Sequence, residues 1–203
     1  ISLINEKGNT VETRILPPDN YTWVKEKPNS FGDFLLNFPL EKYGTQILKF
    51  NNTPILTQDL HEAVYKIDIG EKDLQQCADS VIRLYAEFLW KENRKDEIAF
   101  HFTSGDLVKR SVIRKGYRAF VAGNSVSFKK TEGFDDSYQN LKKYLELIYN
   151  YAGTISLTKE TKSVTRTQDL KTGDILIVPG SPGHVVFIAG VCENKEGEKL
   201  SDR

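Results

Sequence analysis

Apolar side chains recur at steps of three and four residues between Asp73 and Asn93, which is the spacing of one face of a helix. The pattern predicts a helix over this segment, with Asp73 as its N-cap and Gln76 as the capping-box partner. A second helix is predicted to begin near Asp135-Asp136-Ser137 and to stop at Gly153, because glycine commonly ends helices. These are the two clearest helices in the chain.

Short runs of β-forming residues predict strands around these helices. The predicted strands are residues 47–50, 63–69, 98–103, 117–121, 125–128, 174–178 and 184–191. The last two flank a turn rich in glycine and proline, so we predict that they form an antiparallel hairpin. β-Forming residues also surround a Pro-Pro-Asp-Asn turn within residues 11–24. After residue 193 we expect only a polar turn.

The charge balance limits the classes of partner that the chain can bind. The 203 residues include 28 Lys or Arg and 28 Asp or Glu, so the formal net charge is +0. A nucleic-acid-binding protein needs a basic face, and the balanced charge argues against nucleic acid as a partner. No apolar run is long enough to span a membrane, so we expect no transmembrane segment. The length fits a single domain, and the oligomeric state is left open.

Cysteine and histidine are scarce. The two cysteines are Cys77 and Cys192, and the three histidines are His61, His101 and His184. Two cysteines make no disulfide framework, and we expect them not to be bonded to each other. Neither CxxC nor HxxxH spacing occurs, so we expect no metal site and no cofactor. His61 and His101 lack a partner pattern and are expected to lie on the surface or to fill strands.

Cys77 lies in the first turn of the strongest predicted helix. The positive end of a helix dipole favours the nucleophilic thiolate. A cysteine nucleophile also needs a base, and His184 opens a predicted strand directly after the glycine-rich turn. The structural alternative is that Cys77, which also falls on the apolar face, is a small buried core residue, and that His184 is a turn or edge residue.

Other polar residues near this pair have possible structural or catalytic roles. A backbone N–H near Cys77, helped by the Gln76 side chain, would form an oxyanion hole, whereas Gln76 is alternatively only the capping partner. Asp79 and Arg83 are four residues apart on the same helix and are expected to form a solvated ion pair. Asp174 is expected to stabilise a turn.

The segment from Gly173 to Gly190, GDILIVPGSPGHVVFIAG, resembles the Gly-Asp and Gly-His strands of papain-like bacterial amidases of the NlpC-like and CHAP groups. In those enzymes a cysteine at a helix start is the nucleophile. A histidine on the first core strand is the base, and a polar residue on the next strand orients it. The resemblance implies Cys77 as the nucleophile and His184 as the base.

A broader resemblance covers most of the chain. Its segments are SFGDFLLNFPL, DLQQCADSVIRLYAEFLW, FTSG, GYR, YAGTISL and GSPGHVVFIAG. They are similar to one family of secreted or lipid-anchored bacterial proteins, found in Bacteroidota among others and known only as a domain of unknown function. The resemblance implies an extracytoplasmic location and brings no activity. Family members continue into a further strand with a polar, Gln-containing segment that this sequence lacks, so the third catalytic position is unassigned.

The residues and resemblances together predict an α+β fold with a papain-like, NlpC-like core. A single domain is expected, with an N-terminal elaboration (1–70) and a core (71–203) in which the Cys77 helix packs on an antiparallel sheet. The expected function is a cysteine hydrolase of the amidase or peptidase type, acting on a peptide or cell-wall fragment. The alternatives are a non-catalytic envelope protein for binding or structure, and a lipid or thioester acyl hydrolase or transferase.

Overall fold

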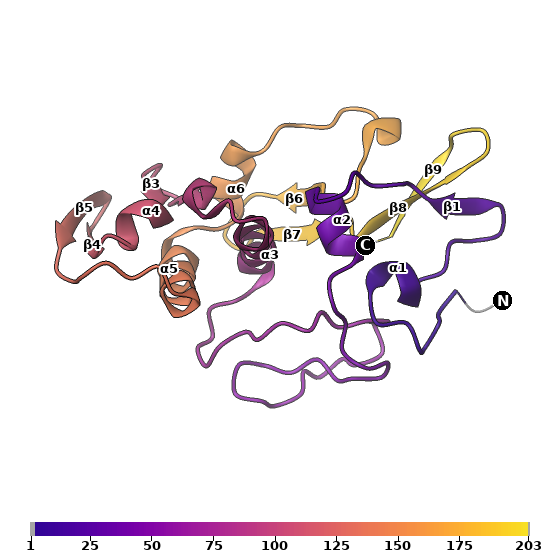
Figure 1. Cartoon of the computed structure of the whole chain (residues 1–203), viewed down its shortest axis with the longest axis horizontal. Helices are drawn as coiled ribbons and strands as arrows, with labels where there is room; N and C mark the ends of the chain where they lie inside the picture. Colours follow the sequence, from indigo (N-terminus) through magenta and orange to yellow (C-terminus); the bar gives the residue numbers. More distant parts are fainter. Residues whose placement is uncertain (1–2, 203) are drawn as a thin grey trace. The chain divides into compact units, whose positions relative to one another are not determined.

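The structure is a computed structural model that describes residues 3–202 (Figure 1). Within these residues six α-helices accompany several small antiparallel sheets, which confirms the predicted α+β class. The helices are α1 (Val11–Arg14), α2 (Phe31–Leu36), α3 (Cys77–Lys91), α4 (Arg110–Ile113), α5 (Tyr138–Tyr151) and α6 (Thr154–Glu160), with the 3-10 helices η1 (Lys95–Glu97) and η2 (Thr167–Asp169). The strands are β1 (Tyr21–Trp23), β2 (Ala99–His101), β3 (Leu107–Lys109), β4 (Tyr117–Ala122), β5 (Ser125–Lys130), β6 (Ile175–Val178), β7 (His184–Phe187), β8 (Gly190–Asn194) and β9 (Lys199–Asp202).

The described chain divides into two compact units. The first comprises the residues up to Asp73, residues 163–176 and the residues from 186 onwards, and the second comprises 74–162 and 177–185. The C-terminal strands group with the N-terminal segment because β1 pairs antiparallel with β8, and β8 pairs antiparallel with β9. The sheet of the first unit therefore joins segments from opposite ends of the sequence.

The first unit has a small apolar core formed by Val11, Leu36 and Leu40. Trp23 of β1 packs against this core. Gly190 of β8 comes so close to Trp23 that a Cβ atom at this position would lie 2.4 Å from the indole ring, so no larger residue fits there without a shift. Between α2 and α3 runs a long segment with no helix or strand of its own (Figure 1).

Arg14 is the largest polar side chain buried in the first unit, with 1% of its surface exposed. Its guanidinium donates to backbone carbonyl oxygens: Nε and Nη2 to Gly8 at 2.9 and 2.6 Å, and Nη2 to Glu41 at 3.0 Å. These bonds hold two loops against the end of α1. The backbone thereby satisfies a buried cation that would otherwise be costly to remove from water.

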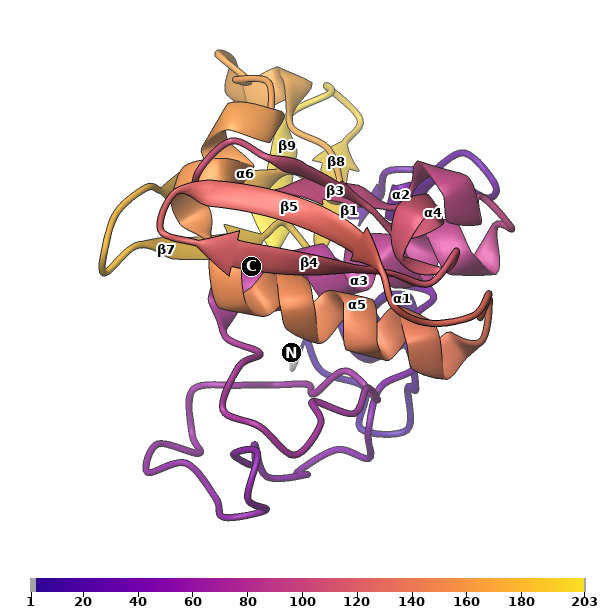
Figure 2. The ribbon, with the colours of Figure 1, turned by 90° about the vertical axis from the view of Figure 1, so that its left-hand side faces the viewer.

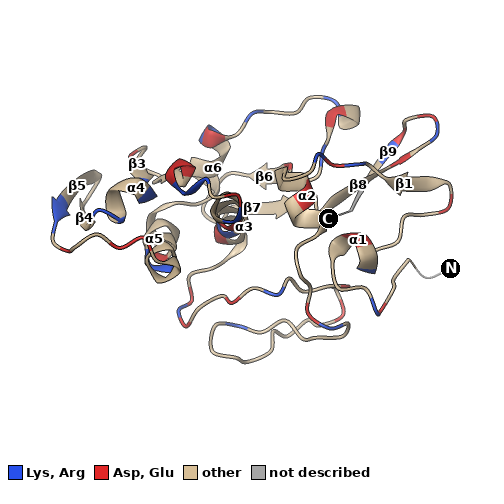
Figure 3. Ribbon diagram, in the orientation of Figure 1, with Lys and Arg blue, Asp and Glu red and all other residues tan. Residues whose placement is uncertain are grey.

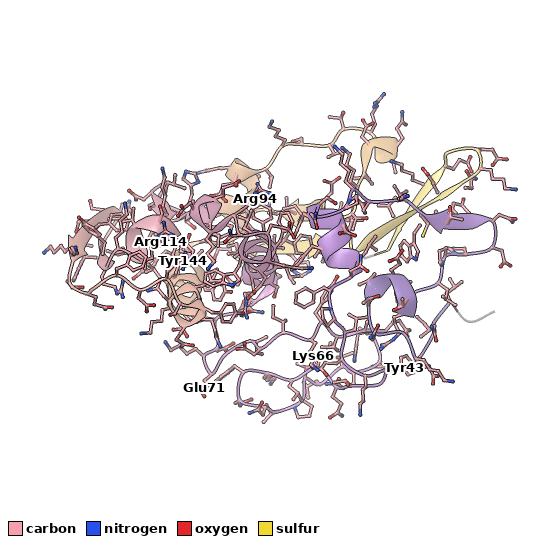
Figure 4. The ribbon with its side chains drawn as sticks, viewed as in Figure 1. Tyr43, Lys66, Glu71, Arg94, Arg114 and Tyr144 are labelled. Carbon is pink, nitrogen blue, oxygen red and sulfur yellow. The ribbon has the colours of Figure 1, made fainter. Side chains whose placement is uncertain are left out.

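The second unit is organised around α3 and α5, and Figure 2 shows α5 along its length. Both helices bury an apolar face, as their three- and four-residue spacing predicts. The large aliphatic side chains that are fully buried on these faces are Ile82, Leu89, Leu141, Leu145 and Ile148. Tyr144 of α5, labelled in Figure 4, is completely buried, and its hydroxyl donates to the carbonyl oxygen of Val108 in β3 at 2.8 Å. This bond ties α5 to the β2–β3 pair.

A charged cluster surrounds Trp90 at the end of α3. The guanidinium of Arg110 lies 4.7 Å and the ammonium of Lys95 3.9 Å from the centre of the indole ring. Arg110 Nη2 and Arg114 Nη1 both donate to Asp136 Oδ1, at 2.7 and 3.4 Å. We call these five residues the Trp90 cluster. Since Arg110 is fully buried, it depends on the Asp136 carboxylate to compensate its charge.

Several predicted elements are confirmed. Helix α5 begins where the pattern predicts, and its N-cap is Ser137, whose hydroxyl accepts a hydrogen bond from the N–H of Asn140 at 3.1 Å. The two strands predicted over 117–121 and 125–128 form the β4–β5 hairpin. The two strands around the glycine-rich turn also pair, as β6 and β7.

The predicted start of the Cys77 helix is wrong. Helix α3 begins at Cys77 and its N-cap is Gln76, whereas the sequence pattern placed the N-cap at Asp73. The difference arises because the Asp79 carboxylate accepts the N–H of Gln76 at 3.1 Å, which closes the helix at this residue. Cys77 is therefore the first helical residue, nearer to the end of the helix dipole than predicted.

Two predicted strands are absent from the first unit as described. Residues 47–50 and 63–69 form only the isolated bridges Leu48↔Pro54 and Leu40↔Tyr65. Pro54 lacks an N–H to donate, so it cannot extend a ladder from that bridge.

Local capping and non-local pairing explain the other differences. Residues 11–14, expected as β-forming, make the short helix α1, because the Thr10 hydroxyl accepts the N–H of Thr13 and caps it. The strand predicted over 184–191 ends at Phe187, and the chain re-enters a different sheet as β8. The expectation of only a polar turn from residue 193 onwards is wrong, because β8 continues to Asn194 and β9 follows and pairs with it.

Candidate functional site

Cys77 occupies the first position of the 15-residue helix α3. Its thiol is half-buried, whereas the next two residues, Ala78 and Asp79, are buried. The backbone N–H groups of a first helical turn have no partner within the helix and create a positive potential there. The partial exposure of Cys77 and its place at this end of the helix are both compatible with a reactive thiol.

His184 is the first residue of β7 and is exposed. The loop before it is anchored on the start of α6: the hydroxyl of Thr154 accepts the N–H of Gly180 at 3.2 Å and donates to its carbonyl oxygen at 3.3 Å. A Cβ atom at Gly183 would lie 2.1 Å from the same hydroxyl oxygen, so this position requires glycine. The packing of this loop fixes the backbone directly before His184.

Cys77 and His184 belong to the same compact unit. Within residues 3–202, no hydrogen bond joins the Cys77 thiol to the His184 ring. The expectation that the two side chains approach each other stays a prediction. Sequence reasoning identified both residues, and the structure gives each a defined backbone position at the end of a regular element.

Gln76, the predicted oxyanion-hole residue, is exposed, and its backbone is fully used by the helix start. Its N–H donates to Asp79, and its carbonyl oxygen accepts the N–H and the hydroxyl of Ser80, both at 2.8 Å. The backbone of Gln76 therefore serves as the cap. A role of its side chain toward a ligand stays a prediction.

The expected solvated pair of Asp79 and Arg83 is wrong, because both side chains are buried, with 7% and 4% of their surfaces exposed. The Arg83 guanidinium forms its salt bridge with Glu87 at 2.8 Å and also donates to Gln75 Oε1 at 3.3 Å and to the Tyr138 hydroxyl at 3.2 Å. The packing of α3 against α5 buries this polar face. Spacing of four residues on a helix is the same for exposed and buried pairs, so the sequence could not distinguish them.

Burial raises the pKa of the Asp79 carboxyl to about 6, although the hydrogen bond from the N–H of Gln76 favours the charged form. Burial and the hydrogen bond to Glu87 raise the pKa of Tyr138 to about 12. Burial also raises the pKa of Tyr149 on α5. Around pH 6, Asp79 therefore changes its charge while the two tyrosines stay neutral. Sequence reasoning missed this buried acidic group beside the Cys77 turn.

The raised pKa of Asp79 predicts a specific pH dependence of stability. The folded state binds the proton of Asp79 more tightly than the unfolded state, so this residue makes the protein less stable as the pH rises from about 4 to about 6. Asp79→Asn removes the effect and keeps an oxygen that accepts the N–H of Gln76. At pH 7 we expect it to stabilise the protein by about 1–2 kcal/mol, a value reduced for partial solvent screening. Urea unfolding at pH 4 and pH 7 measures this.

Asp73→Asn is the matched control for that prediction, because Asp73 is exposed and lies outside the helix. It should leave the pH dependence of the wild-type protein unchanged. An Asp79→Asn variant whose stability changes with pH in parallel with the wild type would contradict the assignment.

The remaining polar residues highlighted in the sequence have structural partners. The Asp174 carboxylate accepts the N–H of Lys171 at 2.9 Å, which confirms its predicted role in a turn. His61 Nε2 contacts the carbonyl oxygen of Thr45, and His101 Nδ1 contacts the Glu160 carboxylate. Among residues 3–202, no group of three or more His, Cys, Asp or Glu side chains is arranged to hold a metal ion.

Two further properties concern the charged residues and the helices. Basic and acidic residues are interspersed along the ribbon (Figure 3). None of the helices in the described part of the chain combines the length and the apolar character needed to cross a membrane.

Comparison with known proteins gives one match. The profile of the family described as Domain of unknown function (4846) matches residues 11–201, nearly the whole chain. No curated protein and no solved structure matches the sequence or the structure. The match confirms the expectation of a domain of unknown function, and the description of the family states no activity.

Proposed function

We propose that this chain, which belongs to the family described as Domain of unknown function (4846), is a cysteine hydrolase of the amidase or peptidase type. In this proposal Cys77 is the nucleophile and His184 is the base. The observation that carries this proposal is the position of Cys77 as the first residue of α3, with a half-buried thiol. A thiol at this place experiences the field that stabilises a thiolate. The proposed base, His184, lies in the same compact unit as Cys77.

The proposed reaction has two steps. The Cys77 sulfur attacks the carbonyl carbon of an amide, its proton passes to His184, and the imidazolium returns that proton to the leaving amine. Water then adds to the thioester with His184 as base, which releases the acid and restores the thiol. The first helical N–H groups of α3 would stabilise the developing oxyanion, and the Gln76 side chain would support them.

The substrate class in this proposal is a peptide or a cell-wall fragment outside the cytoplasm. It follows from the resemblance of the Gly-Asp and Gly-His strands to papain-like amidases of the NlpC-like and CHAP groups, on which a papain-like core is also proposed. The pairing of β6 with β7 and the anchored turn between them support this part of the proposal. A periplasmic, secreted or lipid-anchored location belongs to the same proposal.

A non-catalytic envelope protein is the second candidate function. It is favoured by the exposure of His184 and by the lack of a hydrogen bond between its ring and Cys77 within residues 3–202. On this alternative, the α3 start and the β6–β7 turn serve only the fold.

The test is release of free amines and carboxylates from isolated cell-wall peptides, followed by mass spectrometry. The proposal predicts cleavage by the wild-type protein, and loss of at least about 100-fold in rate for Cys77→Ala and for His184→Ala. His61→Ala is the matched control, because it removes a histidine of the other unit, and it should cleave at the wild-type rate. Cleavage that survives Cys77→Ala would exclude the proposed nucleophile.

A further inference from the structure

The first turn of α3 contains a buried carboxyl group that the proposed mechanism does not use. Asp79 lies two residues after Cys77 and is 7% exposed. Its Oδ2 accepts the N–H of Gln76 at 3.1 Å, while its Oδ1 is buried and has no hydrogen-bond partner in the described part of the chain. A buried carboxylate oxygen without a donor is energetically costly. Capping alone requires only one of the two oxygens.

Burial is the largest influence on the Asp79 carboxyl group, and it outweighs the hydrogen bond from the N–H of Gln76. On α3, the Arg83 guanidinium forms a salt bridge with Glu87 and also donates to Gln75 and to the Tyr138 hydroxyl. On α5, Tyr138 and Tyr149 are neutral, because burial raises the pKa of each hydroxyl. The first turn of α3 therefore contains one acidic group that ionises two residues away from Cys77.

We propose that Asp79 is a positioning residue for the Cys77 thiol: its carboxyl group closes the first turn of α3 through Gln76, and its ionisation controls the reactivity of the thiol. This inference rests on the proposed function of Cys77 as a nucleophile. The helix end stabilises one negative charge well, and two negative charges in the same turn repel each other. The thiolate and the Asp79 carboxylate thus compete for the same favourable potential.

The competition has a definite direction. When Asp79 is protonated, a thiolate formed at Cys77 during the reaction gains the full field of the helix end. When Asp79 is ionised, its charge opposes formation of the thiolate. Because burial raises the pKa of Asp79 to about 6, the inhibition develops as the pH rises through this value. The nucleophile is then most strongly assisted under mildly acidic conditions.

The experiment measures the rate constant for alkylation of Cys77 by iodoacetamide from pH 5 to pH 8, by mass spectrometry of the Cys77 peptide. It uses the folded full chain as wild type, as Asp79→Asn and as Ser80→Ala. Asp79→Asn should react about 3–10-fold faster than wild type at pH 7–8 and within twofold of it at pH 5. Ser80→Ala removes an uncharged hydrogen bond of the same turn and should follow the wild-type profile.

The outcomes separate this inference from the proposed function. If Cys77 reacts but the ratio of the Asp79→Asn and wild-type rates is constant with pH, Asp79 only supports the helix and the inference fails alone. If Cys77 stays unreactive in the folded protein for all three chains, the proposed function and the inference fail together.

A second measurement does not depend on the folding of an Asp79 variant. In Cys77→Ser the competing thiolate is removed, so the Asp79 carboxyl carbon, followed by ¹³C NMR, should titrate at lower pH than in the wild type. An unchanged titration would overturn the inference.

Discussion

Asp136→Asn should lower the free energy of unfolding of the second unit by about 2–4 kcal/mol at pH 7. The substitution keeps the shape of the side chain and removes its charge. Arg110 is fully buried and loses its anionic partner, while Arg114 and Lys95 lose the carboxylate that they share with it. Urea unfolding followed by the fluorescence of Trp90, in a Trp23→Phe background, reports this unit, because Arg110 lies against that indole ring.

Asp96→Asn is the matched control. Asp96 also forms an ion pair with Arg114, at 2.7 Å, but its side chain is 68% exposed. Exposed pairs contribute about 0–1 kcal/mol, so this variant should unfold almost as the wild type does. If the two substitutions lowered the free energy of unfolding equally, the prediction would be wrong, because the buried Arg110 would not need the Asp136 carboxylate more than Arg114 needs Asp96.

The contribution of Asp136 also has a predicted pH range. Burial opposes its ionisation, but hydrogen bonds from Arg110 and Arg114 outweigh burial and lower the pKa of Asp136 below its ordinary value. The folded state therefore binds this proton less tightly than the unfolded state. The stabilisation is complete above pH about 4 and is lost as the pH falls further.

Arg14→Met should destabilise the first unit by about 3–5 kcal/mol. Methionine retains the apolar stem, but it cannot donate to the carbonyl oxygens of Gly8 and Glu41. The Gly8 acceptor would then be buried without these donors, and the two loops would lose their common anchor. The fluorescence of Trp23, in a Trp90→Phe background, reports the unfolding of this unit in urea.

Arg166→Met provides the control for the Arg14 prediction. Arg166 is 63% exposed and pairs only with Asp169 among the described residues, three positions along the chain. Its loss should change the free energy of unfolding by less than about 1 kcal/mol. If Arg14→Met were equally mild, the buried guanidinium would not be the anchor of these loops.

The elements that the sequence predicted well are those decided by local interactions. Helix α5 follows from its apolar period, and the β4–β5 hairpin follows from two adjacent β-forming runs. The pairing of β1 with β8 was not predicted, because its partners, such as Trp23 and Cys192, come from opposite ends of the chain. No local pattern specifies such a contact.

In the candidate site, too, the features decided by local interactions were predicted, and those decided by packing were not. Sequence motifs identified Cys77 and His184 as candidate nucleophile and base, and the position of Cys77 in the first turn of a helix is confirmed. The start of that helix was misplaced, because the cap depends on Asp79 rather than on Asp73. The burial of Asp79 and Arg83 was missed as well, because the packing of α3 against α5 determines it.

The central claim is that Cys77 is an activated thiol paired with His184. Alkylation of the folded protein with iodoacetamide at pH 6 tests it most directly, because an ordinary thiol with a pKa of about 8.5 is almost wholly protonated there. The account predicts labelling of Cys77 that is slowed about 10-fold or more by His184→Ala and is unchanged by His61→Ala. Labelling of Cys77 only after the protein is unfolded would contradict the account and assign this residue to the core.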